Sequence, residues 1–284
     1  MLTLQSRYRL YRQMAKQKVL YIAQQINPYL PETPMSMSGR QIMQGIQERG
    51  YEVRTFMPKY GCINERRNQL HEVIRLSGMN LIIDDTDHPL IIKVATLQPA
   101  RMQVYFIDNE DYFMRPPVKD LEIDLSPEDN DERIIFYARG VIETVKKLRW
   151  EPAIVHCSGW VSALAPCYLK LIYNEDPSFR NSRVVYSLYG GGFDGTLDDR
   201  FIEKLRHDGL TDEQLSVLGG DKVDITALNK LAITYADAII VAAPDADQAL
   251  VEFAKAAGKP VLEYQDDIAA SPDRYAEFYN SLFE

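Results

Sequence analysis

The sequence has few cysteines and histidines, and it contains no C-x-x-C pair. Its three cysteines are Cys62, Cys157 and Cys167, and it has four histidines. A zinc site needs paired ligands at short spacing, so we expect no metal. An odd, unpatterned set of thiols predicts a reduced protein of the cytoplasm.

Long apolar runs and an excess of basic residues are also missing. No stretch approaches the ~18 apolar residues of a membrane-spanning helix, and the start lacks the apolar core of a signal peptide. The 284 residues carry 41 acidic and 32 basic side chains, a formal net charge of −9. Proteins that bind nucleic acid usually present a basic face. We therefore expect neither nucleic acid nor a membrane as a partner.

The amino terminus is the one basic stretch. Residues 1–31 contain no acid, and their cations are Arg7, Arg9, Arg12, Lys16 and Lys18. We expect residues 1–17 to form a solvated extension ahead of the first strand, with contact to an anion as the alternative. Either Met1 or Met14 could be the native start.

Short apolar runs alternate with helical stripes along most of the chain. Strands are predicted at 18–23, 51–57, 153–157, 183–188, 238–242 and 260–262, and helices at 38–49, 129–148, 161–173, 224–235, 245–257 and from Ser271. Ser38 is the expected cap of the first helix, after a proline-rich loop. This alternation predicts an α/β fold, a doubly wound Rossmann-like parallel sheet.

Residues 70–108 depart from this alternation. Two apolar runs flank the polar turn Asp84–His88, as in a β-hairpin, and residues 102–107 add a strand. We expect an antiparallel insertion on top of the parallel sheet. The acidic residues Asp84, Asp85 and Asp87 are expected to form a solvated turn.

A glycine-rich stretch, Tyr189-Gly-Gly-Gly-Phe-Asp-Gly195, follows the strand at 183–188. Ligands of parallel sheets bind at the carboxyl ends of the strands, where this loop, 24–37 and 156–161 are expected. A phosphate loop also needs a helix N-terminus behind it, and the next helical signal, Leu197-Asp-Asp-Arg200, opens with two acids. The stretch therefore favours a flexible or closely packed loop over an anion site.

Four further segments occur in a characteristic order. They are residues 18–60, which begin K-V-L-Y-I-A and end M-P-K-Y, Val104–Phe113, Trp150–Lys170 and Asn229–Asp237. In order and spacing they resemble the amino-terminal part of bacterial glycogen synthases and plant starch synthases. The resemblance covers about residues 18–250.

The resemblance implies a domain of a GT-B glycosyltransferase. Such enzymes have two Rossmann-like domains and transfer glucose from ADP-glucose to an α-1,4-glucan. We expect residues 18–262 to be the amino-terminal domain, which handles the acceptor, and 263–284 to be a helical tail. We expect the carboxyl-terminal domain, which holds most of the sugar nucleotide, to be absent.

The three loops depart from the family's pattern. Where the family has K-T-G-G-L-A-D-V, this sequence has Pro31, Glu32 and Thr33. Proline donates no N–H, and a carboxylate 4 Å from a phosphate charge costs about 4 kcal/mol at an effective dielectric constant of about 20. The family's H-x-H-D-W is His156-Cys-Ser-Gly-Trp160, without the acid. Its H-N-L-A-Y-Q-G is Tyr189–Gly195, without the histidine.

No catalytic residue is assigned, and the binding candidates all come from these loops. They are Pro31, Glu32, Thr33, His156, Ser158, Gly159, Trp160, Tyr189, Gly190, Gly191, Gly192, Phe193 and Asp194. For His156, packing or hydrogen bonding is the favoured interpretation, and a ligand or proton-transfer role is the alternative. For Trp160, packing is favoured, and stacking on a sugar ring is the alternative.

Two functions remain open. The first is a non-catalytic binding, scaffolding or regulatory protein with a protein partner or self-association. The second is a glucosyltransferase that acts alone or with a separate carboxyl-terminal partner. Neither needs a cofactor, and the ligands implied by the resemblance are ADP-glucose and a glucan.

Overall fold

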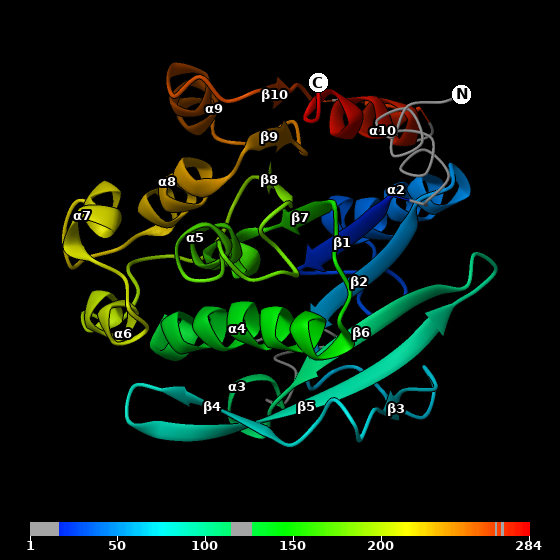
Figure 1. The fold of residues 1–284 in the computed structure, drawn as a ribbon, viewed down its shortest axis with the longest axis horizontal. Coiled ribbons are helices and arrows are strands. Elements are labelled where there is room, and N and C mark those ends of the chain that lie inside the picture. The colour runs from blue at the N-terminus through cyan, green and yellow to red at the C-terminus, as the bar shows by residue number, and fades with distance from the viewer. Residues whose placement is uncertain (1–16, 115–126, 265, 268–269) are drawn as a thin grey trace, which may run out of the picture.

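Parallel strands form the centre of the protein (Figure 1). The computed structural model describes residues 17–114, 127–264, 266–267 and 270–284, so the predicted basic extension lies almost wholly outside the described residues. In spatial order the parallel strands are β10 (Val261–Leu262), β9 (Ala238–Val241), β8 (Arg183–Leu188), β7 (Ile154–Ser158), β1 (Lys18–Ala23), β2 (Glu52–Pro58) and β6 (Met102–Asp108).

The central strands are apolar without alternation because helices cover both faces of the sheet. Every residue of β7 and β9 is buried, as is all of β1 except its first residue. α2 (Pro34–Glu48) packs with α10 (Ser271–Ser281) on one face. On the other, α5 (Leu164–Leu171) packs with α4 (Asn130–Leu148) and with α8 (Ile225–Tyr235), which also contacts α9 (Gln248–Ala256) (Figure 1). The predicted doubly wound α/β fold is confirmed.

Short helical segments connect these elements. They are α3 (Glu110–Phe113), α6 (Phe201–His207), α7 (Asp212–Leu215) and the 3₁₀ turns Pro127–Asp129, Trp160–Ser162 and Ser216–Leu218. The sequence pattern did not predict α3 or α7, and for α6 it gave only the helical signal Leu197–Arg200 just before it, because each of these helices is too short to repeat an apolar stripe. Among the described residues, no helix has both the length and the apolar character needed to cross a membrane.

The insertion extends the sheet, and the prediction that it lies on top of the sheet is wrong. β5 (Thr86–Leu97) runs antiparallel to β6, and both β4 (Met79–Ile83) and β3 (His71–Glu72) pair with β5. β6 itself is parallel to β2, so it belongs to the main sheet. One side of β6 hydrogen-bonds with β2. The backbone N–H and C=O groups on its other side would be unpaired, and they hydrogen-bond with β5.

The first helix begins earlier than predicted. Thr33, rather than Ser38, caps α2: its hydroxyl accepts from Ser36 N at 3.0 Å, and Thr33 N donates to Ser36 Oγ at 2.9 Å. Pro34 occupies the first helical position, where its fixed φ suits the helix and its missing N–H costs nothing. Ser38 is buried within the helix.

The hairpin turn is tighter and less solvated than predicted. Only Asp84 and Asp85 separate β4 from β5. The Asp84 carboxylate accepts two hydrogen bonds from the Arg200 guanidinium, at 2.7 and 2.8 Å, which lower the pKa of Asp84. The prediction of a solvated turn is therefore wrong for Asp84. The ion pair attaches the hairpin to the segment that opens α6.

A buried ion cluster attaches α6 to the start of α4. Lys204 Nζ lies 2.7 Å from Asp131 Oδ2 and 2.6 Å from Glu132 Oε1, and the lysine side chain is only 6% exposed. The neighbouring carboxylates raise the pKa of Lys204 against the opposing effect of burial. The Lys204 ammonium therefore supplies the counter-charge for two carboxylates in the first turn of α4.

We expect Lys204→Met to lower the free energy of unfolding by about 3–5 kcal/mol, because it leaves the buried Asp131 carboxylate without its counter-charge. Urea unfolding followed by circular dichroism measures the change. Lys222→Met is the control, since Lys222 is exposed and no ion pair is found for it among the described residues. Equal stability of the two variants would contradict the assignment.

Candidate functional site

The three loops predicted from the sequence meet at one edge of the sheet. β1, β7 and β8 are adjacent and parallel, so their carboxyl ends open on the same side. Gln24 N donates to Ser158 O at 3.0 Å, and Ser158 Oγ donates to Tyr189 OH at 3.3 Å. A Cβ on Gly159 would lie 2.6 Å from Gln24 Oε1. The loops are therefore packed directly against one another.

The glycine-rich loop packs against the segments that begin α8 and α9. A Cβ on Gly190 would lie 2.3 Å from the Asp245 carboxylate, and one on Gly192 would lie 2.4 Å from Ile225 Cγ1. Gly191, with φ +75°, has open space beside it. Two of the three consecutive glycines thus permit close approach of neighbouring segments.

A cavity of about 290 Å³ lies between this loop and the two helix starts. Its aromatic wall is Tyr189 and Phe193, and its carboxylates are Asp194, Asp245 and Asp247. Thr226, in the first turn of α8, adds a hydroxyl. The described residues that line the cavity include no lysine or arginine. Such a lining accepts hydrogen bonds and offers apolar surface.

His156 is enclosed beneath this edge. It is 1% exposed, and its Nδ1 and Nε2 lie 2.6 Å from Tyr279 OH and Ser187 Oγ. Burial lowers the pKa of His156 to about 3, so the ring is neutral at pH 7. Both ring nitrogens are occupied by side chains. In this structure His156 links α10 to the end of β8, and it does not line the 290 Å³ cavity.

Tyr189 connects the glycine loop to the face that carries α2. Its hydroxyl hydrogen-bonds with the side chains of Ser158, Tyr21 and Ser38, and burial raises the pKa of Tyr189. Ser38 also borders a second cavity, of about 40 Å³. The position of Tyr189 is therefore fixed from three elements.

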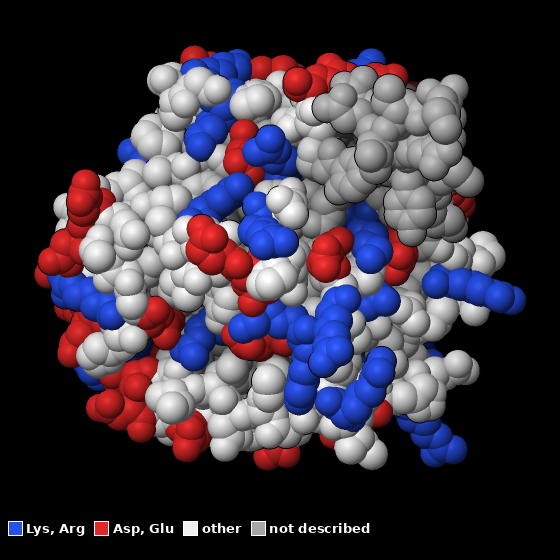
Figure 2. All heavy atoms as spheres, in the orientation of Figure 1, with Lys and Arg blue, Asp and Glu red and all other residues white. Residues whose placement is uncertain are grey.

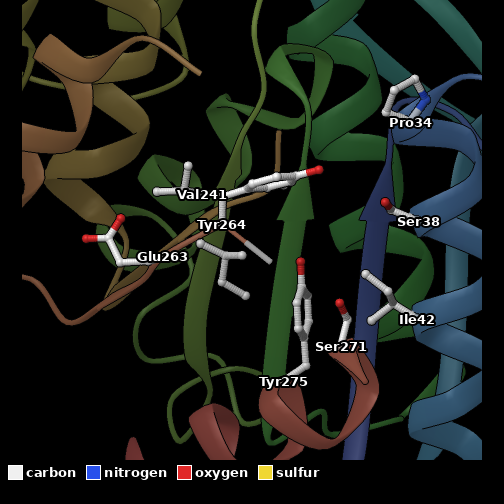
Figure 3. Close-up of a pocket in the computed structure, with 10 residues that line it drawn as sticks. Pro34, Ser38, Ile42, Val241, Glu263, Tyr264, Ser271 and Tyr275 are labelled. Atoms are coloured by element: carbon white, nitrogen blue, oxygen red, sulfur yellow. The ribbon is translucent and has the colours of Figure 1, made fainter. Parts of the chain in front are cut away.

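The second cavity lies between α2, the end of β9 and α10. Figure 3 shows the hydroxyls of Tyr264, Tyr275 and Ser38 directed into it, with Ser271 beside them. At about 40 Å³ it has room for about two or three water molecules. It is too small for a sugar ring, so the 290 Å³ cavity is the candidate site.

Trp160 and the first loop contribute little to that cavity. Trp160 is buried and packs edge-on against Phe193, with ring centroids 5.0 Å apart. Pro31 and Glu32 are exposed, and Thr33 caps α2 and donates to Gln25 Oε1 at 2.8 Å. None of these four residues lines the 290 Å³ cavity.

The site residues that the sequence did not predict come from the segments after β8 and β9. Asp245 and Asp247 follow β9, and Thr226 follows the cap of α8. The segment Ala242-Ala-Pro-Asp245 leaves the carboxyl end of a predicted strand, and this signal could have identified it. Among the described residues, no group of three or more His, Cys, Asp or Glu side chains is arranged to hold a metal.

The sequence matches the starch synthase catalytic domain family over residues 18–259. The glycogen synthase of Chlorobium luteolum is 34% identical over 189 residues, which are 66% of this chain and 39% of that protein. The glycogen synthase of Chlorobium phaeovibrioides is 32% identical over 228 residues, 80% of this chain and 46% of that protein. The chain thus spans less than half the length of these curated relatives. The predicted resemblance is confirmed.

A solved structure is similar in fold. The catalytic domain of starch synthase IV from Arabidopsis thaliana, bound to ADP and acarbose, superposes with a TM-score of 0.73 at 18% sequence identity. The match covers 90% of this chain and 53% of that one. At this identity the likeness concerns the fold.

The enclosed imidazole generates a pH dependence of stability. In the unfolded chain His156 binds a proton as the pH falls through its ordinary pKa of 6.5, whereas in the folded protein it does so only near 3. The free energy of unfolding should therefore decrease below pH 6.5, by up to about 1.4 kcal/mol per pH unit.

We expect His156→Gln to remove this slope. Urea unfolding at pH 7, 6, 5 and 4 gives the free energy of unfolding of the wild type and the variant. The difference between the two at each pH isolates the contribution of His156, because the other titrating groups are common to both proteins. His71→Gln, at an exposed position, is the matched control and should retain the slope. Parallel pH profiles of the wild type and His156→Gln would contradict the account.

Proposed function

Because the chain belongs to the starch synthase catalytic domain family, we propose that it is a glucan-binding domain that does not transfer glucose on its own. The 290 Å³ cavity is the observation that carries this proposal. Its volume is close to that of the smallest ligand pockets, about 300 Å³. Carboxylates and Thr226 can bond sugar hydroxyls, and the rings of Tyr189 and Phe193 offer apolar surface to the face of a pyranose.

Three features support the absence of transfer by this chain alone. The described lining of the cavity has no cation to bind the pyrophosphate of ADP-glucose. The loop that would face the donor in the family presents Glu32. His156, the remaining group of the family's second loop that can transfer a proton, is enclosed by Ser187 and Tyr279. ADP-glucose is accordingly a poor ligand in this proposal.

A second candidate function is glucosyl transfer together with a separate polypeptide that supplies the donor site. Family membership favours it. Under either function a protein partner, or a second copy, would cover the open edge of the sheet, and the free thiols suit a cytoplasmic location.

Incubation of the chain with radiolabelled ADP-glucose and glycogen separates the two functions. We expect no incorporation of glucose above a protein-free blank, because nothing in the described cavity neutralises the donor phosphates. Sustained turnover by the isolated chain would contradict the non-catalytic proposal. Turnover that appears only when cell extract is added would favour the second candidate.

Binding to glucan is tested by filling the cavity. We expect Gly191→Gln to weaken maltoheptaose binding at least tenfold in isothermal titration calorimetry, because the new side chain projects from the cavity lining. Gly195→Gln is a matched control: φ is +75° at Gly191 and +79° at Gly195, both have open space, and only Gly191 lines the cavity. Both substitutions should lower the stability of the protein by a similar amount, so a difference in affinity reports on the cavity. If the two variants bind maltoheptaose equally well, the glucan binds elsewhere.

A further inference from the structure

Two helix N-termini border the candidate cavity, and each is capped by an aspartate. Helix starts usually attract anions because their first N–H groups are unpaired and carry partial positive charge. Here Asp224 Oδ1 accepts from Ala227 N at 2.8 Å at the start of α8, and Asp247 Oδ1 accepts from Ala249 N at 2.8 Å at the start of α9. At each helix start the capping carboxylate therefore occupies one of the first N–H groups and places a negative charge where a phosphate would bind.

The carboxylates that face the cavity are not neutralised. Asp194, Asp245 and Asp247 line it, all three are exposed to solvent, and no ion pair is found for them within the described ranges. Asp245 is held against the backbone of Gly190, where a Cβ would lie 2.3 Å from its carboxylate. A phosphate entering the cavity would meet three negative charges and no described lysine or arginine.

We propose that Asp194, Asp245 and Asp247 are specificity-determining residues that admit the uncharged end of a glucan and exclude phosphorylated sugars. The proposal rests on the proposed function, because it assumes that the cavity binds a glucan. Carboxylates accept hydrogen bonds from sugar hydroxyls and repel phosphate oxygens, so the same three residues serve binding and selection.

The selection is electrostatic and depends on ionic strength. In water, with a dielectric constant of about 80, a single carboxylate about 4 Å from a phosphate weakens phosphate binding about fivefold. Three carboxylates at somewhat larger distances together weaken it about tenfold or more. Salt screens such exposed charges, with a Debye length of about 3 Å at 1 M. The preference for uncharged sugar should therefore be largest at low salt and should shrink as salt is added.

The test compares maltose with maltose 1-phosphate, two ligands that differ by one phosphate group. Isothermal titration calorimetry at low salt should give the wild-type protein at least a tenfold preference for maltose. In the double variant Asp194→Asn, Asp245→Asn the ratio of the two affinities should fall at least threefold, whatever the change for maltose itself. Asp247 is retained because it caps α9.

Glu175→Gln is the control for the change in net charge. Glu175 is exposed, lies between α5 and β8 at the opposite edge of the sheet, and should leave the ratio unchanged. Equal wild-type affinity for both ligands, or a ratio that the double variant does not alter, would overturn the selection while glucan binding stands. Absence of maltose and maltoheptaose binding to the wild type would overturn both proposals.

Discussion

The close approach of the glycine loop to its neighbours requires that positions 190 and 192 carry no side chain. A Cβ at these positions would overlap the Asp245 carboxylate and Ile225, at 2.3 and 2.4 Å. With glycine, the loop after β8 lies against the segment after β9 and the first turn of α8. This contact brings Asp245 to the cavity and so adds one of the three carboxylates of the candidate site.

Polar contacts fix the strand ends on which this loop depends. Tyr279 of α10 hydrogen-bonds His156 on β7, which hydrogen-bonds Ser187 on β8, two residues before Tyr189. On the same face the Tyr189 hydroxyl is bonded to side chains from β1, β7 and α2. Helix α10 is therefore part of the support of the site, although it lies on a face of the sheet (Figure 1).

Charges are distributed unevenly over the face shown in Figure 2, where acidic side chains gather near the ends of α6 and α7.

The sequence was sufficient to predict the fold class, because central strands that are buried on both faces appear as unbroken apolar runs. It also identified the loops that meet, since ligand loops leave the carboxyl ends of parallel strands. It could not place the insertion, because pairing of β5 with the edge of β6 leaves no periodic signal. It also missed Asp245 and Asp247, whose proximity to Gly190 depends on β8 and β9 being neighbours. The domain boundaries stay a prediction.

The central claim is that the cavity behind Tyr189–Gly195 holds a glucan. A crystal structure of the chain soaked with maltotriose tests it most directly. The account predicts a glucosyl unit in that cavity, with its hydroxyls within hydrogen-bond distance of Asp194 or Asp245 and its ring against Tyr189 or Phe193. An ordered maltotriose bound elsewhere, with this cavity filled only by water, would contradict it.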